Sequence, residues 1–234
     1  MYDYPAYQYP DFPPQKQRRK FPWLHLFLFL ATIGTTILAG GVLYSATLLA
    51  ILGTHELGHY WASKRWKVQV TLPYFIPAPT LVGTFGAFIK MRSPIPDRKV
   101  LFQIGVAGPL AGFVVALPAL IIGLWLSEVR PSLGGPPPGS LSFGSSLLIT
   151  LAVRFVLGVS SDAYDILLHP IGVAAWFGLF VTALNLIPIG QFDGGHIIYA
   201  LFPRRYAFLS RVAFLSLIPL GYWWWEGWLF WAFL

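Results

Sequence analysis

The sequence contains no cysteine, and this absence excludes disulfide bonds and thiolate metal ligands. A metal ion would have to be bound by histidine or carboxylate side chains. Charged residues are also scarce: they make up 11% of the 234 residues, whereas soluble domains contain about 25%. Because 56% of the residues are hydrophobic and the mean hydropathy is +0.64, we expect a polytopic membrane protein.

The net charge of +7 does not indicate a nucleic-acid-binding protein, because the basic residues form no continuous stripe. They form short clusters at the ends of apolar runs, which is typical of positive-inside topology. The first cluster, 16–20, ends a Tyr- and Pro-rich segment, 1–20, that has no helical or strand period and is predicted to be a disordered tail. We expect the N-terminus to be cytoplasmic and the membrane to be a prokaryotic plasma membrane.

Three apolar runs follow the tail, each long enough to span a bilayer at about 20 residues per crossing. The first, 21–43, could instead be a signal peptide, but the apolar core of such a peptide is only about 7–15 residues long and starts nearer the first residue. We prefer a retained helix. The second run, 45–62, is followed by basic residues at 64–67 and is predicted to cross back; the third covers 100–126.

The segments between and after these runs carry many turn signals. Residues 68–99 are punctuated by proline and partly alternate, which predicts strands and turns in the form of a β-hairpin-like insertion. Residues 127–140 are predicted to be a loop. The apolar segment 141–158 is expected to lie on the surface or to be partly buried, because a crossing there would move Arg204 and Arg205 to the outer face.

A fourth helix is predicted to begin near Ile171, to break around "NLIPIGQFDGG" and to resume towards Leu201. A fifth run starts near Tyr206, and the chain ends within an apolar stretch, so we expect a truncated chain or a sixth helix cut short. The predicted fold is an all-α polytopic bundle of about five or six transmembrane helices with a small membrane-associated β-hairpin-like insertion. It would form a single domain, 21–234, with a catalytic core at about 44–201.

The motif His55-Glu56-Leu57-Gly58-His59 places two histidines four residues apart. On a helix they project from one face and can share a metal ion, while Glu56 can reach a water at that metal without being a ligand. The alternative is a pair of packing histidines. That alternative predicts no third ligand and leaves a glutamate unpaired at membrane depth, at a cost of about 2.5–3.5 kcal/mol.

A catalytic zinc site usually has three protein ligands and one open position. Asp193 is the only carboxylate between Asp165 and Glu226, and it follows the predicted break in the fourth helix. It could instead cap the helix after Gly190. His196 is a rival third ligand, which we rank lower because it leaves the aspartate unexplained.

Taken together, HELGH, the Ala107–Pro109 motif AGP, and NLIP with FDGG resemble the site-2 protease family of intramembrane zinc metalloproteases. The resemblance implies one Zn2+ per chain, with Glu56 as the general base and with the ligands His55, His59 and Asp193. It implies an endopeptidase that cleaves transmembrane segments of single-span proteins with a metal-activated water. Phe192 stands where the family more often has leucine. We expect a short form without the PDZ domain of many bacterial relatives.

Two further site predictions concern the substrate. Asn185 is the nearest upstream polar side chain that could stabilise a developing oxyanion, although an interhelical hydrogen bond is the alternative role. Residues 83–91 favour β-structure and contain two glycines, so we expect a strand with a free edge to which unwound substrate adds. An ordinary connecting loop is the alternative. The predicted substrate-binding residues are Gly83, Thr84, Phe85, Gly86, Ala87 and Phe88.

Two other functions fit the composition. A zinc- or proton-handling transport protein would use histidines and carboxylates as a relay, but it needs polar residues along a path through several helices. Here they converge on one helix and one helix break. The second alternative function is that of an inactive relative that only binds membrane helices, and the intact Glu56 argues against it.

Overall fold

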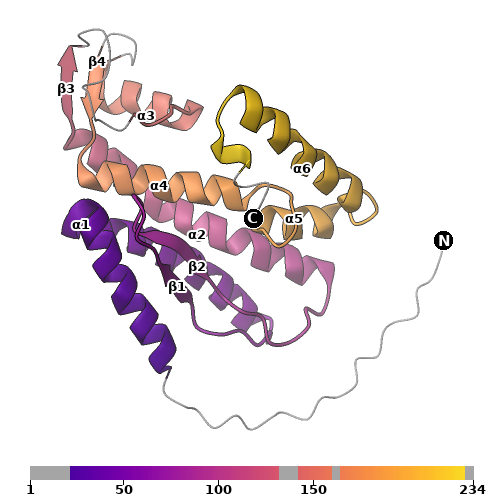
Figure 1. Ribbon diagram of the computed structural model, residues 1–234. Helices are drawn as coiled ribbons and strands as arrows, with labels where there is room; N and C mark the ends of the chain where they lie inside the picture. The colour runs from indigo at the N-terminus through magenta and orange to yellow at the C-terminus, as the bar shows by residue number, and fades with distance from the viewer. Residues whose placement is uncertain (1–21, 132–141, 160–163, 230–234) are drawn as a thin grey trace.

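The computed structural model describes residues 22–131, 142–159 and 164–229 (Figure 1). The predicted tail at 1–20 and the last residues of the chain lie outside this part. Most of the described chain is helical, as predicted, and two small antiparallel sheets accompany the helices.

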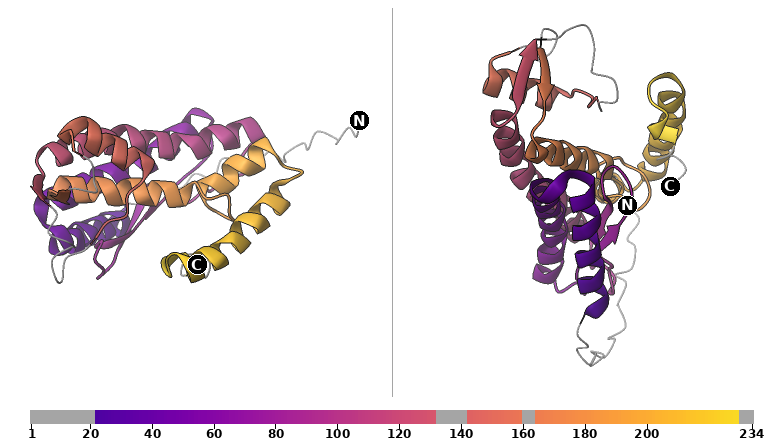
Figure 2. Two further views of the ribbon diagram at one scale, coloured as in Figure 1. Left: turned by 90° about the horizontal axis from the view of Figure 1, so that it is seen from above. Right: turned by 60° about the vertical axis from the view of Figure 1, so that its left-hand side comes forward.

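Helix α1, Trp23–Arg65, contains a reversal at Gly41, whose φ of 83° and ψ of 179° are not helical. The hydroxyl oxygens of Thr36 and Ser45 lie 2.7 Å apart, although nine residues of straight helix would separate them by about 13 Å. The two limbs of α1 therefore run back along each other and form an arch in the right-hand view of Figure 2. This confirms two consecutive helices, with the turn at Gly41, where a positive φ favours glycine.

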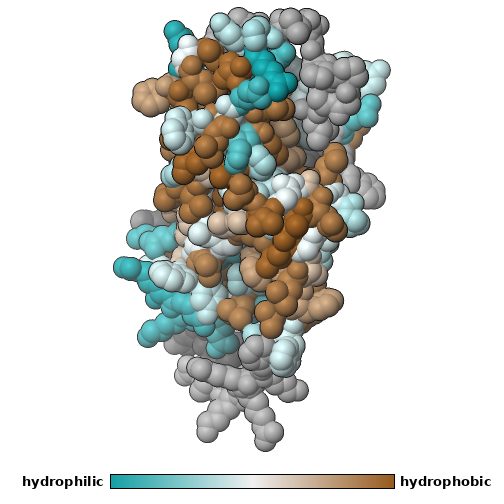
Figure 3. Space-filling view, turned by 90° about the vertical axis from the view of Figure 1, so that its left-hand side faces the viewer, coloured by the Kyte–Doolittle hydropathy of each residue, from teal (hydrophilic) through white to brown (hydrophobic). Residues whose placement is uncertain are grey.

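Two helices, α1 and α2 (Arg98–Trp125), are long and apolar enough to cross a membrane. Helix α3, Leu147–Leu157, has 11 residues and rises about 16 Å, less than the roughly 30 Å of a bilayer core. Apolar side chains cover most of the middle of the face in Figure 3. The described helices thus give two candidate spans by length and composition, and five or six spans are not confirmed.

The bundle is held together where small residues let helices approach closely. Gly123 of α2 lies against the backbone of Gly172 in α4, Pro170–Asn185, and a Cβ there would collide with it. Gly178 of α4 packs against the side chain of Ile51 in the second limb of α1. This is typical of membrane helices, whose contacts depend on van der Waals packing.

The predicted β-hairpin follows α1. Strand β1, Tyr74–Pro77, pairs antiparallel with β2, Thr84–Phe88. The hairpin packs on α1, where the hydroxyl of Tyr44 donates a hydrogen bond of 2.9 Å to the carbonyl of Val82. Among the described strands β2 pairs only with β1, so its second edge is free of strand partners.

The second sheet contradicts the loop predicted at 127–140. Strand β3, Glu128–Pro131, pairs antiparallel with β4, Tyr164–Leu167. The pairing partner lies more than thirty residues further along the chain, so local turn signals around Pro131 could not indicate it. Only residues 128–131 of the predicted loop are affected, and residues 132–140 lie outside the described part of the chain.

The predicted break in the fourth helix is confirmed. Helix α4 ends at Asn185, an irregular turn follows, and α5 runs from Asp193 to Leu201. After a short turn, α6 covers Tyr206–Trp223 and packs against α5 at the side of the bundle (Figure 1). The break is what brings Asp193 to the side of α1.

Candidate metal centre

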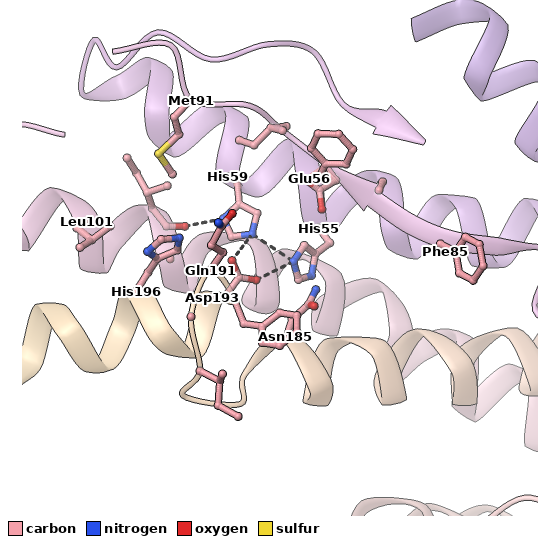
Figure 4. Close-up of a pocket in the computed structure, with 18 of the residues that line it drawn as sticks. His55, Glu56, His59, Phe85, Met91, Leu101, Asn185, Gln191, Asp193 and His196 are labelled. Carbon is pink, nitrogen blue, oxygen red and sulfur yellow. Dashed lines mark hydrogen bonds and ion pairs between the residues drawn. The ribbon is translucent and has the colours of Figure 1, made fainter. Parts of the chain in front are cut away.

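Three side chains from two helices meet in one cluster (Figure 4). His55 Nε2 lies 3.1 Å from Asp193 Oδ2, and His59 Nε2 lies 3.2 Å from Asp193 Oδ1. The two Nε2 atoms lie 3.2 Å apart. The histidines share one helix face, as their spacing predicts, and the aspartate comes from a position 138 residues after His55.

The cluster is buried, with 3% of His55 and 6% of His59 exposed. The Nδ1 of His59 lies 2.7 Å from the carbonyl oxygen of Ile104. A carbonyl only accepts, so Nδ1 carries the proton and donates it, which leaves the Nε2 lone pair facing the cluster. Metal-binding histidines are commonly oriented by such a hydrogen bond from the second ring nitrogen.

The donor set fits Zn2+. In tetrahedral geometry, zinc bonds of about 2.0–2.1 Å separate neighbouring ligand atoms by about 3.3 Å. The two imidazole nitrogens lie 3.2 Å apart, close to this value, and each lies 3.1–3.2 Å from one oxygen of Asp193, Oδ2 for His55 and Oδ1 for His59. Two imidazoles and one carboxylate would leave the fourth position open, as in catalytic zinc sites.

Helix α2 shapes the cluster without contributing a ligand. A Cβ on Gly108 would overlap the imidazole of His59, and a Cβ on Gly112 would stand 3.2 Å from the Cβ of His55. Gly105, one turn earlier, lies against His196 and the backbone of Asp193. In the sequence, Gly108 stood out only as part of the AGP motif, and this role was not predicted. The signal was present, because positions 105, 108 and 112 follow the 3–4 spacing of one helix face.

Asp193 does not cap its helix. The cap of α5 is Phe192, without a side-chain capping hydrogen bond, and the carboxylate of Asp193 is directed at the two histidines instead. His196 lines the same pocket but lies outside the cluster of potential ligands.

The cluster opens into a pocket of about 810 Å³. Glu56 lines it and is 6% exposed, and Ile89, just after β2, lines the same pocket. Asn185 points its amide towards His55 from the end of α4 (Figure 4). The structure thus brings Glu56 and Asn185 together with the three candidate ligands.

Half of the predicted substrate-binding residues line this pocket, namely Phe85, Ala87 and Phe88. Thr84 is buried and donates a 2.7 Å hydrogen bond to the carbonyl of Ile76 in β1. Gly83 packs against the backbone of Thr36. The first residues of the predicted set therefore hold the hairpin in place.

Residues 43–219 match Peptidase family M50. The chain belongs to this family, the site-2 proteases. It is 38% identical over 177 residues to "Probable zinc metalloprotease EGY1, chloroplastic" of Oryza sativa subsp. japonica, covering 74% of this chain and 30% of that protein. The Arabidopsis thaliana protein of that name is 38% identical over 181 residues, covering 74% and 32%. "Probable zinc metalloprotease EGY2, chloroplastic" of Arabidopsis thaliana is 32% identical over 205 residues, covering 87% and 36%.

Membership of Peptidase family M50 confirms the resemblance carried by the three motifs, and the zinc metalloprotease relatives accord with Zn2+ as the metal. The chain spans about a third of the length of these relatives. The matched segment contains the second limb of α1 with both histidines, the β1–β2 hairpin, α2 and α5.

Proposed function

We propose that the protein is an intramembrane zinc endopeptidase that cleaves transmembrane segments of single-span membrane proteins. The observation that carries this proposal is the buried convergence of His55, His59 and Asp193 beside Glu56 in one pocket. Membership of Peptidase family M50 supports it. The transport alternative has no support, because the buried histidine and carboxylate side chains of the described residues converge on this one pocket.

Each side chain of the pocket has a proposed role. His55, His59 and Asp193 hold the metal, which when bound supplies a Lewis acid and lowers the pKa of a water. Glu56 accepts a proton from the attacking water and passes it to the leaving amine. The Asn185 amide donates a hydrogen bond to the negative charge that develops on the substrate carbonyl.

Substrate presentation is proposed to use the free edge of β2. A peptide bond in a membrane helix is shielded by its own hydrogen bonds, so the substrate must be extended near the metal. Added to β2, an extended segment would lie along Phe85, Ala87 and Phe88, which line the pocket that contains Glu56. Ile89, which directly follows this strand, lines the same pocket as the general base.

The proposal is tested with the Glu56→Gln variant and a purified single-span membrane substrate. Glutamine keeps the size of the side chain and spares the three ligands, so zinc content should stay near one per chain while cleavage is abolished. Glu128→Gln, an exposed carboxylate on β3, is the matched control and should cleave at the wild-type rate. Full cleavage activity of Glu56→Gln would refute the role of Glu56 as general base.

The orientation in the membrane is also a proposal. The indole of Trp66 donates a 2.8 Å hydrogen bond to Gln103, which ties the basic end of α1 to the start of α2. Arg98 shares a hollow with Arg204 and Arg205, so three basic clusters gather at one end. We place this end, with the N-terminus, on the side from which the chain inserts.

The names of the relatives indicate which membrane could contain this protein. The names of the EGY1 and EGY2 relatives place those proteins in chloroplasts, and they give no support to a prokaryotic plasma membrane. The basic end would face the stroma in a plastid or the cytoplasm in a bacterium.

We further propose a single protease domain over 21–234 with its core at about 44–201, supported by the family match at 43–219.

A further inference from the structure

Two neighbouring hollows, of about 680 and 830 Å³, lie where the start of α2 meets the turn between α5 and α6. Figure 1 and the left-hand view of Figure 2 both show these two segments side by side. Arg98 lines both hollows. The other basic side chains that line them are Lys99, Arg204 and Arg205.

These four cations are exposed, and in the described part of the chain no carboxylate forms an ion pair with any of them. Of the described residues that line the hollows, Asp97 is the only acidic one. Its carboxylate already accepts a 2.9 Å hydrogen bond from the backbone N–H of Val100 as the cap of α2. The two hollows therefore present positive charge that the protein does not neutralise.

The walls beside the cations are apolar. Tyr199, Leu201 and Phe202 line the second hollow and are each about half exposed, and Phe102 lines the first. A small soluble anion makes no apolar contact with such a wall, whereas the acyl chains of a lipid can pack against it. Trp66, whose indole bonds Gln103 at the rim of the first hollow, has the amphipathic side chain that is enriched at the membrane surface.

We propose that this junction binds an anionic phospholipid, with its phosphate on the arginines and its acyl chains along Leu201 and Phe202. Guanidinium groups match phosphate oxygens in pairs, and basic hollows between helix ends are suited to anionic headgroups. Positive-inside topology alone requires basic residues near the surface, but it does not require them to line one hollow from two distant segments. The lipid would bridge α2 to α5, the helix that begins with Asp193.

The test uses the zinc-loaded protein in an uncharged detergent, with added phosphatidylglycerol or phosphatidylcholine. Phosphatidylglycerol should raise the melting temperature saturably and remain bound in native mass spectrometry, while phosphatidylcholine should do neither. Each arginine removed should weaken binding about fivefold, so the triple variant Arg98→Gln, Arg204→Gln, Arg205→Gln should bind on the order of a hundredfold more weakly. If the triple variant does not fold, Arg98→Gln and Arg204→Gln are measured singly.

The control variant removes three exposed arginines elsewhere, at Arg130, Arg154 and Arg211, and should keep the lipid-induced shift. Glu56→Gln should also keep it, so lipid binding and proteolysis can fail separately. The proposal would be overturned if phosphatidylcholine raised the melting temperature as much as phosphatidylglycerol does. It would also be overturned if the control variant lost as much lipid binding as the triple variant. An equal shift with soluble glycerophosphate would also overturn it, because a free phosphate would then fill the site without a lipid.

Discussion

The change Gly108→Ala adds one methyl group to α2 at the place where His59 packs. The added Cβ would overlap the imidazole on its Nε2 side, closer than the 3.0 Å that real Cβ atoms essentially never breach. The ring has little freedom, because its Nδ1 donates a 2.7 Å hydrogen bond to Ile104 and the side chain is 6% exposed. Restoring an ordinary carbon contact of about 3.5 Å would require a shift of about 1 Å or more.

A shift of this size exceeds the roughly 0.2 Å within which metal–ligand distances are held. We expect zinc affinity to fall about 10–100-fold, and cleavage at saturating zinc to fall about 100-fold because the reacting groups are displaced. Competition with a chromogenic chelator measures the first quantity, and product formation from a single-span substrate measures the second.

The matched control is Gly53→Ala, the same substitution on the helix that carries the histidines. Its Cβ would meet only the ring of Phe75, at 3.8 Å, which is ordinary contact. This variant should bind zinc and cleave like the wild type. Wild-type zinc affinity and cleavage in Gly108→Ala would refute the role assigned to α2.

Three other outcomes are expected. Alanine substitution of His55, His59 or Asp193 should remove the zinc, whereas His196→Ala should keep it, as measured by metal analysis. Loss of zinc in His196→Ala together with retention in Asp193→Ala would show that the third ligand is misassigned. Proline at Ala87 or Phe88 removes a backbone donor and should reduce cleavage while zinc content is kept, with Leu81→Pro in the exposed preceding turn as control; undiminished cleavage would leave β2 as a connector. Single cysteines at Lys67 and Arg204 should be labelled from the same side, since the chain has no native cysteine, and opposite labelling would contradict the proposed orientation.

Much of the fold could be predicted because its signals are local. Apolar runs with basic ends indicated the helices, prolines within 68–99 indicated the β1–β2 hairpin, and "NLIPIGQFDGG" indicated the break between α4 and α5. The β3–β4 sheet was missed because each strand has four residues and its partner lies far along the chain. The number of spans depends on how the helices tilt and pack, which composition does not determine.

The site was predictable for a different reason. Ionisable side chains are costly in an apolar chain, so the few that are present stand out, as His55, Glu56 and Asp193 do. What could not be predicted was the part made by backbone and by absent side chains. The carbonyl of Ile104, which orients His59, belongs to a residue whose side chain carries no chemical signal.

The position of α2 explains why a site of so few ligands needs three helices. Two ligands lie on α1 and one on α5, and α2 packs against both helices. On its glycine face, Gly108 and Gly112 receive the two histidine rings, and Gly105 lies beside the first residue of α5. A larger residue at any of these positions would separate α1 or α5 from α2. The distance between the ligands is therefore set by a helix that binds no metal, and this is why changes on α2 should act first on zinc affinity.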